Sequence, residues 1–132
     1  MERAMRAGGA YFLVVFAIGF VLGTIRTLFV IPRFGETNAI LVELPVMLAA
    51  SWIACIWLVR RFAVSTALRD RLAMGVVAFA LLMLGELSVS MYGFGRTAAD
   101  HVASYRTLGA QLGLAAQVLF ALMPIAQAAL RR

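Results

Sequence analysis

Three ionisable side chains lie inside long apolar segments of this sequence, and they carry most of the chemistry that it offers. Arg26 lies in the first apolar segment, Glu43 in the second and Glu86 in the third. An ionisable residue in a bilayer costs about 2.5–3.5 kcal/mol on insertion scales, and such residues usually face the bundle interior and find partners. We therefore expect Arg26 to pair with Glu43 or Glu86, which leaves one carboxylate over.

The carboxylate left over can be accommodated in three ways. It can stay protonated, it can bind a cation, or Arg33 or Arg96 can fold down to neutralise it. The first two ways describe a site for a proton, an ion or a small ligand, and the third describes a structural cluster that fixes helix register. A further interpretation is that the charged groups snorkel to the membrane interface and have no specific role.

The apolar segments place the three charges at one depth if each segment forms a helix. We predict transmembrane spans over about 9–31, 38–59, 72–92 and 108–130. At 1.5 Å per residue, Arg26, Glu43 and Glu86 lie roughly 7–9 Å from the same end of their spans. Pro32 is expected to end the first span, and the short connection PRFGET makes spans one and two antiparallel neighbours. The pattern predicts a polar pocket at the outer side, roofed by the first and third connections.

Polar residues on the spans extend the predicted pocket. Gln117 follows a stripe of small residues in the fourth span, where helices pack closely. Gln111 lies at the depth of the charges on another face of that span, and Ser90 shares a helix face with Glu86. We expect these three polar residues to surround the charged cluster.

Glycines at four-residue spacing mark two helix faces. Gly19 and Gly23 lie on the first span, and Gly109 and Gly113 lie on the fourth. Stripes of small residues let helix backbones approach closely. We expect close helix packing within the chain at both stripes, with contacts between two copies as the alternative.

The third connection, about 93–106, is the longest polar stretch. Its segment TAADHVASYR predicts one or two turns of interfacial helix, with Arg96 and Asp100, and His101 and Tyr105, at i,i+4 spacing. Arg96 and His101 can reach the pocket from this connection, although we expect His101 to be a solvated loop histidine. One histidine without a cysteine partner falls short of a metal site, so we predict neither a metal nor a cofactor.

The composition indicates a protein whose solvent is lipid. Of the 132 residues, 64% are hydrophobic and 14% are charged, whereas charged residues make up about 25% of soluble domains. Four apolar runs use nearly the whole length and leave no room for a soluble domain. The predicted fold class is therefore an all-α membrane protein with four transmembrane helices in an up-down bundle, forming a single domain over 1–132.

The arginines predict how this bundle is oriented. Eight of them flank the ends of the chain and the second connection, and three lie in the first and third connections. Cytoplasmic loops carry the excess of basic residues, so we predict that both termini are cytoplasmic, in a bacterial inner membrane. The net charge of +6 then reflects topology, and no nucleic acid partner is expected.

Three functions are consistent with these residues. The first is a small integral membrane protein that binds or passes a small solute, a lipid headgroup or an ion at the Arg26, Glu43 and Glu86 pocket. The second is an accessory or scaffold subunit of a larger membrane complex, in which the cluster is structural. The third, which we favour less, is an intramembrane enzyme that uses the two carboxylates for acid–base chemistry. The lipid bilayer is the expected partner, and a homo-oligomer is consistent with so short a chain.

Overall fold

The computed structural model describes residues 2–93 and 95–130, and within these residues it contains helices and no strand. The α-helices are α1 (Glu2–Ile25), α2 (Ile31–Phe34), α3 (Glu36–Arg61), α4 (Leu68–Ser88), α5 (Ala98–Ala103) and α6 (Leu108–Leu130). Two π-helical segments, Arg26–Val30 and Val89–Gly93, continue α1 and α4, and a 3-10 turn, Ser104–Arg106, follows α5.

Four helical stretches are long and apolar enough to cross a membrane. They are Glu2–Phe34, Asn38–Arg61, Leu68–Gly93 and Ala110–Leu130. Only 6% to 28% of the residues in their apolar windows are buried inside the molecule, so most of this apolar surface faces outward. The prediction of an all-helical chain with four helices of transmembrane length and composition is confirmed. Arg131 and Arg132, which contribute to the predicted orientation, lie outside the described residues.

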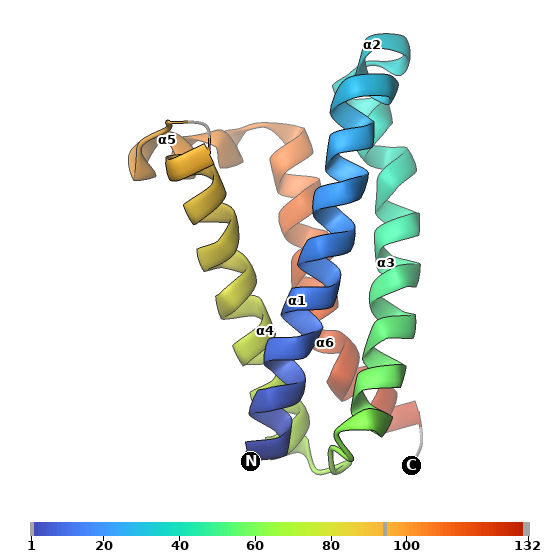
Figure 1. Ribbon diagram of the computed structural model, residues 1–132. Helices are drawn as coiled ribbons and strands as arrows, with labels where there is room; N and C mark the ends of the chain where they lie inside the picture. Colours follow the sequence, from blue (N-terminus) through green and yellow to red (C-terminus); the bar gives the residue numbers. More distant parts are fainter. Residues whose placement is uncertain (1, 94, 131–132) are drawn as a thin grey trace.

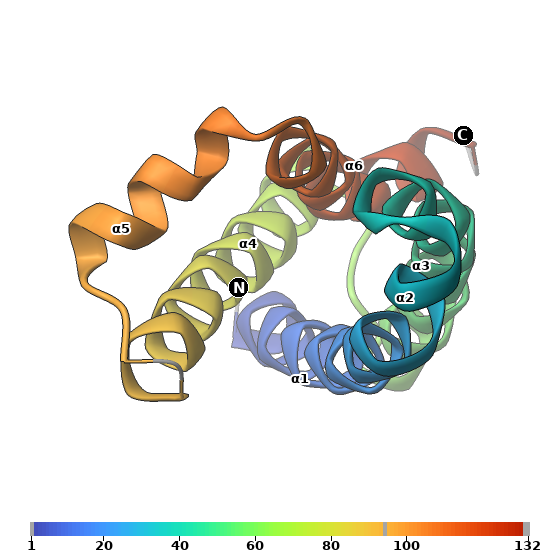
Figure 2. The same cartoon turned by 90° about the horizontal axis from the view of Figure 1, so that it is seen from above.

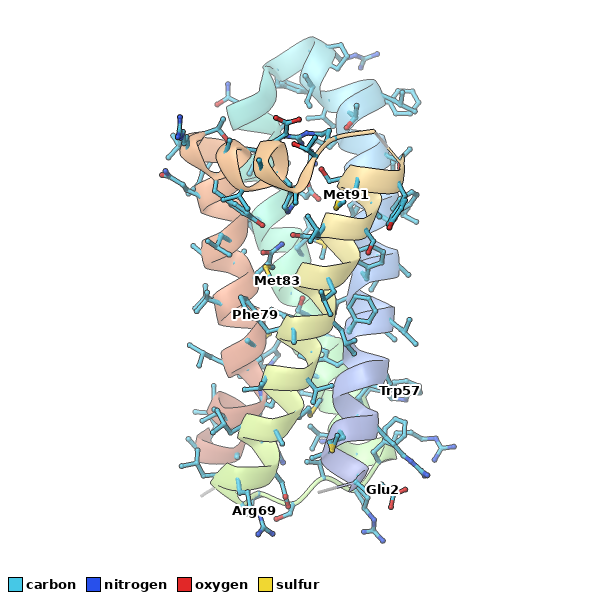
Figure 3. The ribbon with its side chains drawn as sticks, turned by 90° about the vertical axis from the view of Figure 1, so that its left-hand side faces the viewer. Glu2, Trp57, Arg69, Phe79, Met83 and Met91 are labelled. Atoms are coloured by element: carbon cyan, nitrogen blue, oxygen red, sulfur yellow. The ribbon has the colours of Figure 1, made fainter. Side chains whose placement is uncertain are left out.

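The four long helices form a ring. The helix α1 contacts α3 and α4, and α6 contacts the same two helices from the other side. Both chain ends and the connection between α3 and α4 lie at one end of the molecule, here called the terminal end (Figure 1). The opposite end, here called the α5 end, holds α2 and α5. Seen from above, α5 lies beside α4 and α6 (Figure 2). A side view places α5 at the level of Met91, far from Glu2 and Arg69 (Figure 3).

The helices approach each other most closely toward the terminal end, where glycines make room. A Cβ atom on Gly8 of α1 would lie 2.7 Å from the carbonyl oxygen of Met74 in α4. A Cβ atom on Gly75 of α4 would lie 2.1 Å from the carbonyl oxygen of Ala121 in α6. Any larger residue would force these backbones apart. Glycine therefore holds α4 tightly between α1 and α6.

A tyrosine joins α1 to α6 across the ring. Tyr11 is fully buried, and its ring stacks on that of Phe120 with the centroids 4.1 Å apart. Its hydroxyl donates a hydrogen bond of 2.9 Å to the carbonyl oxygen of Phe120. Pro124, four residues further on, has no N–H to donate to that carbonyl. Tyr11 therefore satisfies an acceptor that the proline leaves free.

Arg71 lies inside the molecule, although the sequence places it among the orienting arginines of the second connection. It is 1% exposed, and its guanidinium donates to the carbonyl oxygens of Ser65 and Pro124, both at 2.9 Å. A buried cation requires such acceptors. Arg71, which was counted with the arginines that predict the orientation, therefore ties α4 to α6.

The prediction that Pro32 ends the first span is wrong. The helix widens into a π turn, in which the N–H of Ile31 donates to the carbonyl oxygen of Arg26, and it continues through α2. A widened turn of this kind accommodates a proline that cannot make the regular bond. The helix ends at Gly35, whose φ of 84° lies in the region that glycine adopts readily.

Candidate functional site

A cavity of about 780 Å³ lies between the four long helices at the α5 end. Its walls come from the C-terminal parts of α1 and α4, the N-terminal parts of α3 and α6, and the segment after α4. The polar lining residues are Thr24, Arg26, Thr27, Glu43, Ser51, Glu86, Ser90, Arg96, His101, Ser104, Tyr105, Thr107 and Gln117. This volume lies within the range of small-molecule sites, about 300–1,000 Å³.

The floor of the cavity is the apolar core. Val15, Leu82 and Phe120 belong both to the cavity wall and to the cluster of buried side chains below it. Tyr11 stacks on Phe120 just beneath this floor. The cavity is therefore bounded by packed side chains on the side of the terminal end.

Glycines widen the cavity instead of bringing helices together. Gly19, Gly23 and Gly113 line it. A Cβ atom on Gly113 would meet nothing within 4 Å, and one on Gly19 would meet only the end of the Met47 side chain at 3.5 Å. The expected close helix packing at these glycines is absent, and the close contacts of this kind occur at Gly8 and Gly75. The surroundings of Gly109 lie outside the description.

Arg26 and Glu43 form an ion pair on one wall of the cavity. The Arg26 guanidinium donates to the Glu43 carboxylate, and this contact joins the π turn after α1 to α3. The side chains are 31% and 15% exposed, so both charges are largely withdrawn from water. Each charge neutralises the other, as the burial of two opposite charges requires.

Glu86 has a different partner on the opposite wall. Its carboxylate accepts a hydrogen bond from the side-chain amide of Gln117, which joins α4 to α6. Among the described residues, no arginine forms an ion pair with Glu86. The expectation of one cluster of Arg26, Glu43 and Glu86 is therefore replaced by two separate pairs that line one cavity. Glu86 is the carboxylate left over.

Three buried polar atoms of the cavity have no hydrogen-bond partner among the described protein groups. They are Oγ of Ser90, Oε1 of Gln117 and Nδ1 of His101. Buried polar atoms in proteins are nearly always hydrogen-bonded, so each exception calls for an explanation. The three residues that carry these atoms line the cavity.

His101 and Tyr105 form an aromatic pair above the Glu86 wall. The Tyr105 hydroxyl lies 3.4 Å from Nε2 of His101, and the rings meet edge to face. Burial raises the pKa of Tyr105, and the negative charge of Glu86 raises it further. Tyr105 therefore lies close enough to Glu86 to sense its charge. The expectation of a solvated loop histidine is wrong, because Nδ1 of His101 is buried.

Two predicted site residues remain: Arg96 lies at the cavity and Gln111 lies outside it. Arg96 is exposed, and its guanidinium donates to the backbone carbonyl of Asp100 at 3.1 Å while it lines the cavity. Gln111 is exposed and is not among the lining residues. Within the described residues, no group of three or more His, Cys, Asp or Glu side chains could hold a metal ion.

The predicted helix of the third connection is confirmed, and its roofing role applies in part. It forms α5, capped by Thr97 and Asp100, whose side chains each accept from the other's backbone N–H. His101, Ser104 and Tyr105 bring this segment to the cavity. In the first connection, none of the residues 32–35 lines the cavity, and the side chains of 36 and 37 lie outside the description.

Tyr105 and Ser104 are lining residues that the sequence analysis does not assign to the pocket. Both follow α5, and their approach to Glu86 depends on the fold of the third connection. The i,i+4 spacing of His101 and Tyr105 is the signal that could have identified Tyr105, because a histidine at the cavity brings its helix neighbour with it.

Comparisons of this chain with protein-family models, with curated proteins and with solved structures find no match.

Proposed function

We propose that this protein is a four-span, up-down membrane protein that binds a small solute or lipid headgroup in the cavity at the α5 end. The excess of arginines near the termini and the second connection supports cytoplasmic termini in a bacterial inner membrane. The α5 end then faces outward. Arg26 and Glu43 hold the wall together, and Glu86 with Gln117 contacts the bound molecule.

The observation that carries this proposal is the set of unpartnered polar atoms in a large cavity. A structural cluster would be expected to satisfy its own polar groups and to exclude space between its helices. Here Ser90, Gln117 and His101 line a space of about 780 Å³, and each carries a buried polar atom without a partner among the described protein groups. These features favour binding over a purely structural role.

The closed floor supports a binding site over an open channel. The stack of Tyr11 on Phe120 and the hydrogen bond to its carbonyl oxygen lie beneath the cavity. A solute that enters from the α5 end meets this packed layer. Passage to the other side would require these side chains to part, as in alternating access between two conformations.

The scaffold alternative rests on the Arg26–Glu43 pair, which fixes α1 against α3. This pair explains the register of two helices but leaves Glu86 and the unpartnered atoms unexplained. An enzyme that uses both carboxylates is supported less, because Glu43 is held by Arg26 and Glu86 by Gln117.

Thermal unfolding of the purified protein in detergent tests the proposal. The probes share one apolar body and differ in their head groups: 4-phenylbutylamine, 4-phenylbutyrate and 4-phenylbutanol. A molecule that binds only the folded state raises the midpoint of unfolding. We expect at least one probe to raise the midpoint of the wild-type protein, and failure of all three would contradict the proposal.

Two glycine variants provide matched controls. Gly113→Leu adds a side chain that fills the cavity. Gly9→Leu adds the same side chain at a position that does not line the cavity, and a Cβ atom there also meets nothing within 4 Å. We expect Gly113→Leu to lose the response to the probe and Gly9→Leu to keep it. An equal response in both variants would show that the probe acts elsewhere, for example on the detergent.

A further inference from the structure

We propose that the Glu86 wall binds the ammonium group of an amphipathic amine, with Glu86, Gln117 and Ser90 as the contacting residues. This inference rests on the proposed function and names the class of solute. It follows from the kind of polar atoms present, from their charge and from the apolar surface beside them.

The free polar atoms of this wall can all accept a hydrogen bond. Gln117 directs its amide N–H toward Glu86, which leaves its oxygen Oε1 without a partner. Ser90, one turn after Glu86 on the same face, is 6% exposed, and its Oγ has no partner among the described groups. With the carboxylate, these oxygens form an acceptor set, which an ammonium group with three N–H donors complements.

The charges that face this wall favour a cation. Arg26 is neutralised by Glu43, and among the described residues Glu86 forms no ion pair. Arg96 also lines the cavity, but it is exposed and bound to the carbonyl of Asp100, so water screens its charge. The charge that remains inside the cavity is the carboxylate of Glu86.

Apolar and aromatic surface surrounds the acceptors. Leu82 lies four residues before Glu86, about 6 Å along the helix axis, and Phe120 lies three residues after Gln117, about 4.5 Å along the helix axis. Tyr105 lies above, within the influence of the Glu86 charge. Aromatic rings near a carboxylate favour organic cations, and the apolar floor takes up a hydrocarbon body.

The size of the cavity favours an organic cation over a metal ion. A hard metal cation is held by a compact shell of six to eight oxygens at about 2.3–2.6 Å in calcium sites. The described residues contain no cluster of three metal-binding side chains, and most of the roughly 780 Å³ would lie beyond such a shell. An amine with a hydrocarbon chain can contact the acceptors with its ammonium group and the apolar floor with its chain.

Titration of the full-length protein with the three phenylbutyl probes tests the inference. We expect 4-phenylbutylamine to bind, and its affinity to fall at least about tenfold in Glu86→Gln, which removes a charge-assisted contact. The glutamine is isosteric, so the midpoint of unfolding without ligand reports whether the variant is folded. Unchanged amine affinity in a folded Glu86→Gln would overturn the inference.

The N,N,N-trimethyl derivative of the same amine separates hydrogen bonding from charge alone. We expect it to bind about tenfold more weakly than the primary amine, because it has no N–H for Gln117 and Ser90. Ser90→Ala should weaken the primary amine and leave the trimethyl derivative unchanged. Equal affinity of both cations in the wild-type protein would overturn the assignment of Gln117 and Ser90.

The other outcomes distinguish this inference from the proposed function. Binding of 4-phenylbutyrate or 4-phenylbutanol in preference to the amine would overturn the inference and leave the binding function intact. Stabilisation by sodium chloride above that by potassium chloride, with no response to the amine, would assign Glu86 to a metal cation and overturn the inference. No response to any probe would overturn both.

Discussion

At the scale of single residues, two glutamates that line the same cavity differ in their hydrogen-bond partners. Glu43 accepts from Arg26 and becomes part of a neutral pair, whereas Glu86 accepts from the uncharged amide of Gln117. A buried carboxylate without a cation is costly, and proteins keep such groups mainly where they contact a ligand or carry a proton. The difference between the two partners is the reason to place the binding role on Glu86.

The Tyr105 hydroxyl is expected to report the charge of Glu86. Its pKa is raised by burial and then by that carboxylate, so Glu86→Gln should lower the pKa of Tyr105 toward its ordinary value of about 10. The difference in absorbance at 295 nm between each protein and its Tyr105→Phe variant, from pH 9 to 12, measures this titration.

The same titration predicts how stability depends on pH. The folded state disfavours the Tyr105 phenolate. The protonated hydroxyl therefore stabilises the folded protein fully below the ordinary pKa, and this stabilisation is lost as the pH rises toward the raised pKa. The Tyr105→Phe variant should lose less stability over this interval. A Tyr105 pKa that does not respond to Glu86→Gln would contradict the proximity of the two groups.

The residue types in the sequence predicted one of the two side-chain pairs that line the cavity. Opposite charges at one depth favoured a partner for Arg26, and that partner is Glu43. The pairing of Glu86 with Gln117 was not predicted, because it depends on how α4 and α6 are rotated and tilted, and sequence spacing leaves both free.

At the scale of elements, glycines on the same helices serve opposite purposes. Gly75 allows α4 and α6 to touch through their backbones, whereas Gly113 leaves space between helices. Both lie in apolar helical sequence, and the spacing of small residues alone does not distinguish them. The distinction arises because the helices converge near the terminal end and diverge near α5.

Alanine substitution at these two glycines tests this arrangement. Gly75→Ala should destabilise the bundle by about 1–3 kcal/mol, because its Cβ atom would lie 2.1 Å from a backbone oxygen of α6. Gly113→Ala should cost nothing, because its Cβ atom meets nothing within 4 Å. Unfolding in a denaturing detergent measures both. Equal stability of the two variants would contradict the close packing of α4 on α6.

The helical periodicity of α4 indicates that Arg71 is buried, which counting arginines for orientation does not show. Arg71, Met74, Gly75 and Ala78 share one face of α4, and all four are buried. Counting Arg71 as a surface charge overlooks this stripe. Pro32 is a contrasting case, because the π turn that lets the helix continue past it has no clear sequence signature.

At the scale of the whole molecule, the bundle is packed at one end and hollow at the other. Core side chains, the Tyr11–Phe120 stack and Arg71 join the helices toward the terminal end. Toward the α5 end, both π-helical segments border the cavity, and such segments occur frequently at functional sites. The four apolar helices, and hence this overall form, follow from hydropathy, whereas the cavity depends on side-chain packing.

Modification of an engineered cysteine tests most directly whether this hollow end admits solutes. The probe is a positively charged methanethiosulfonate, applied to Gly113→Cys in lipid nanodiscs, where both membrane faces are accessible. The native Cys55 is fully buried and gives the background rate in the wild-type protein. We predict rapid modification of Gly113→Cys and slower modification when 4-phenylbutylamine is present. Modification as slow as that of Cys55 would contradict an accessible cavity, and with it the binding function.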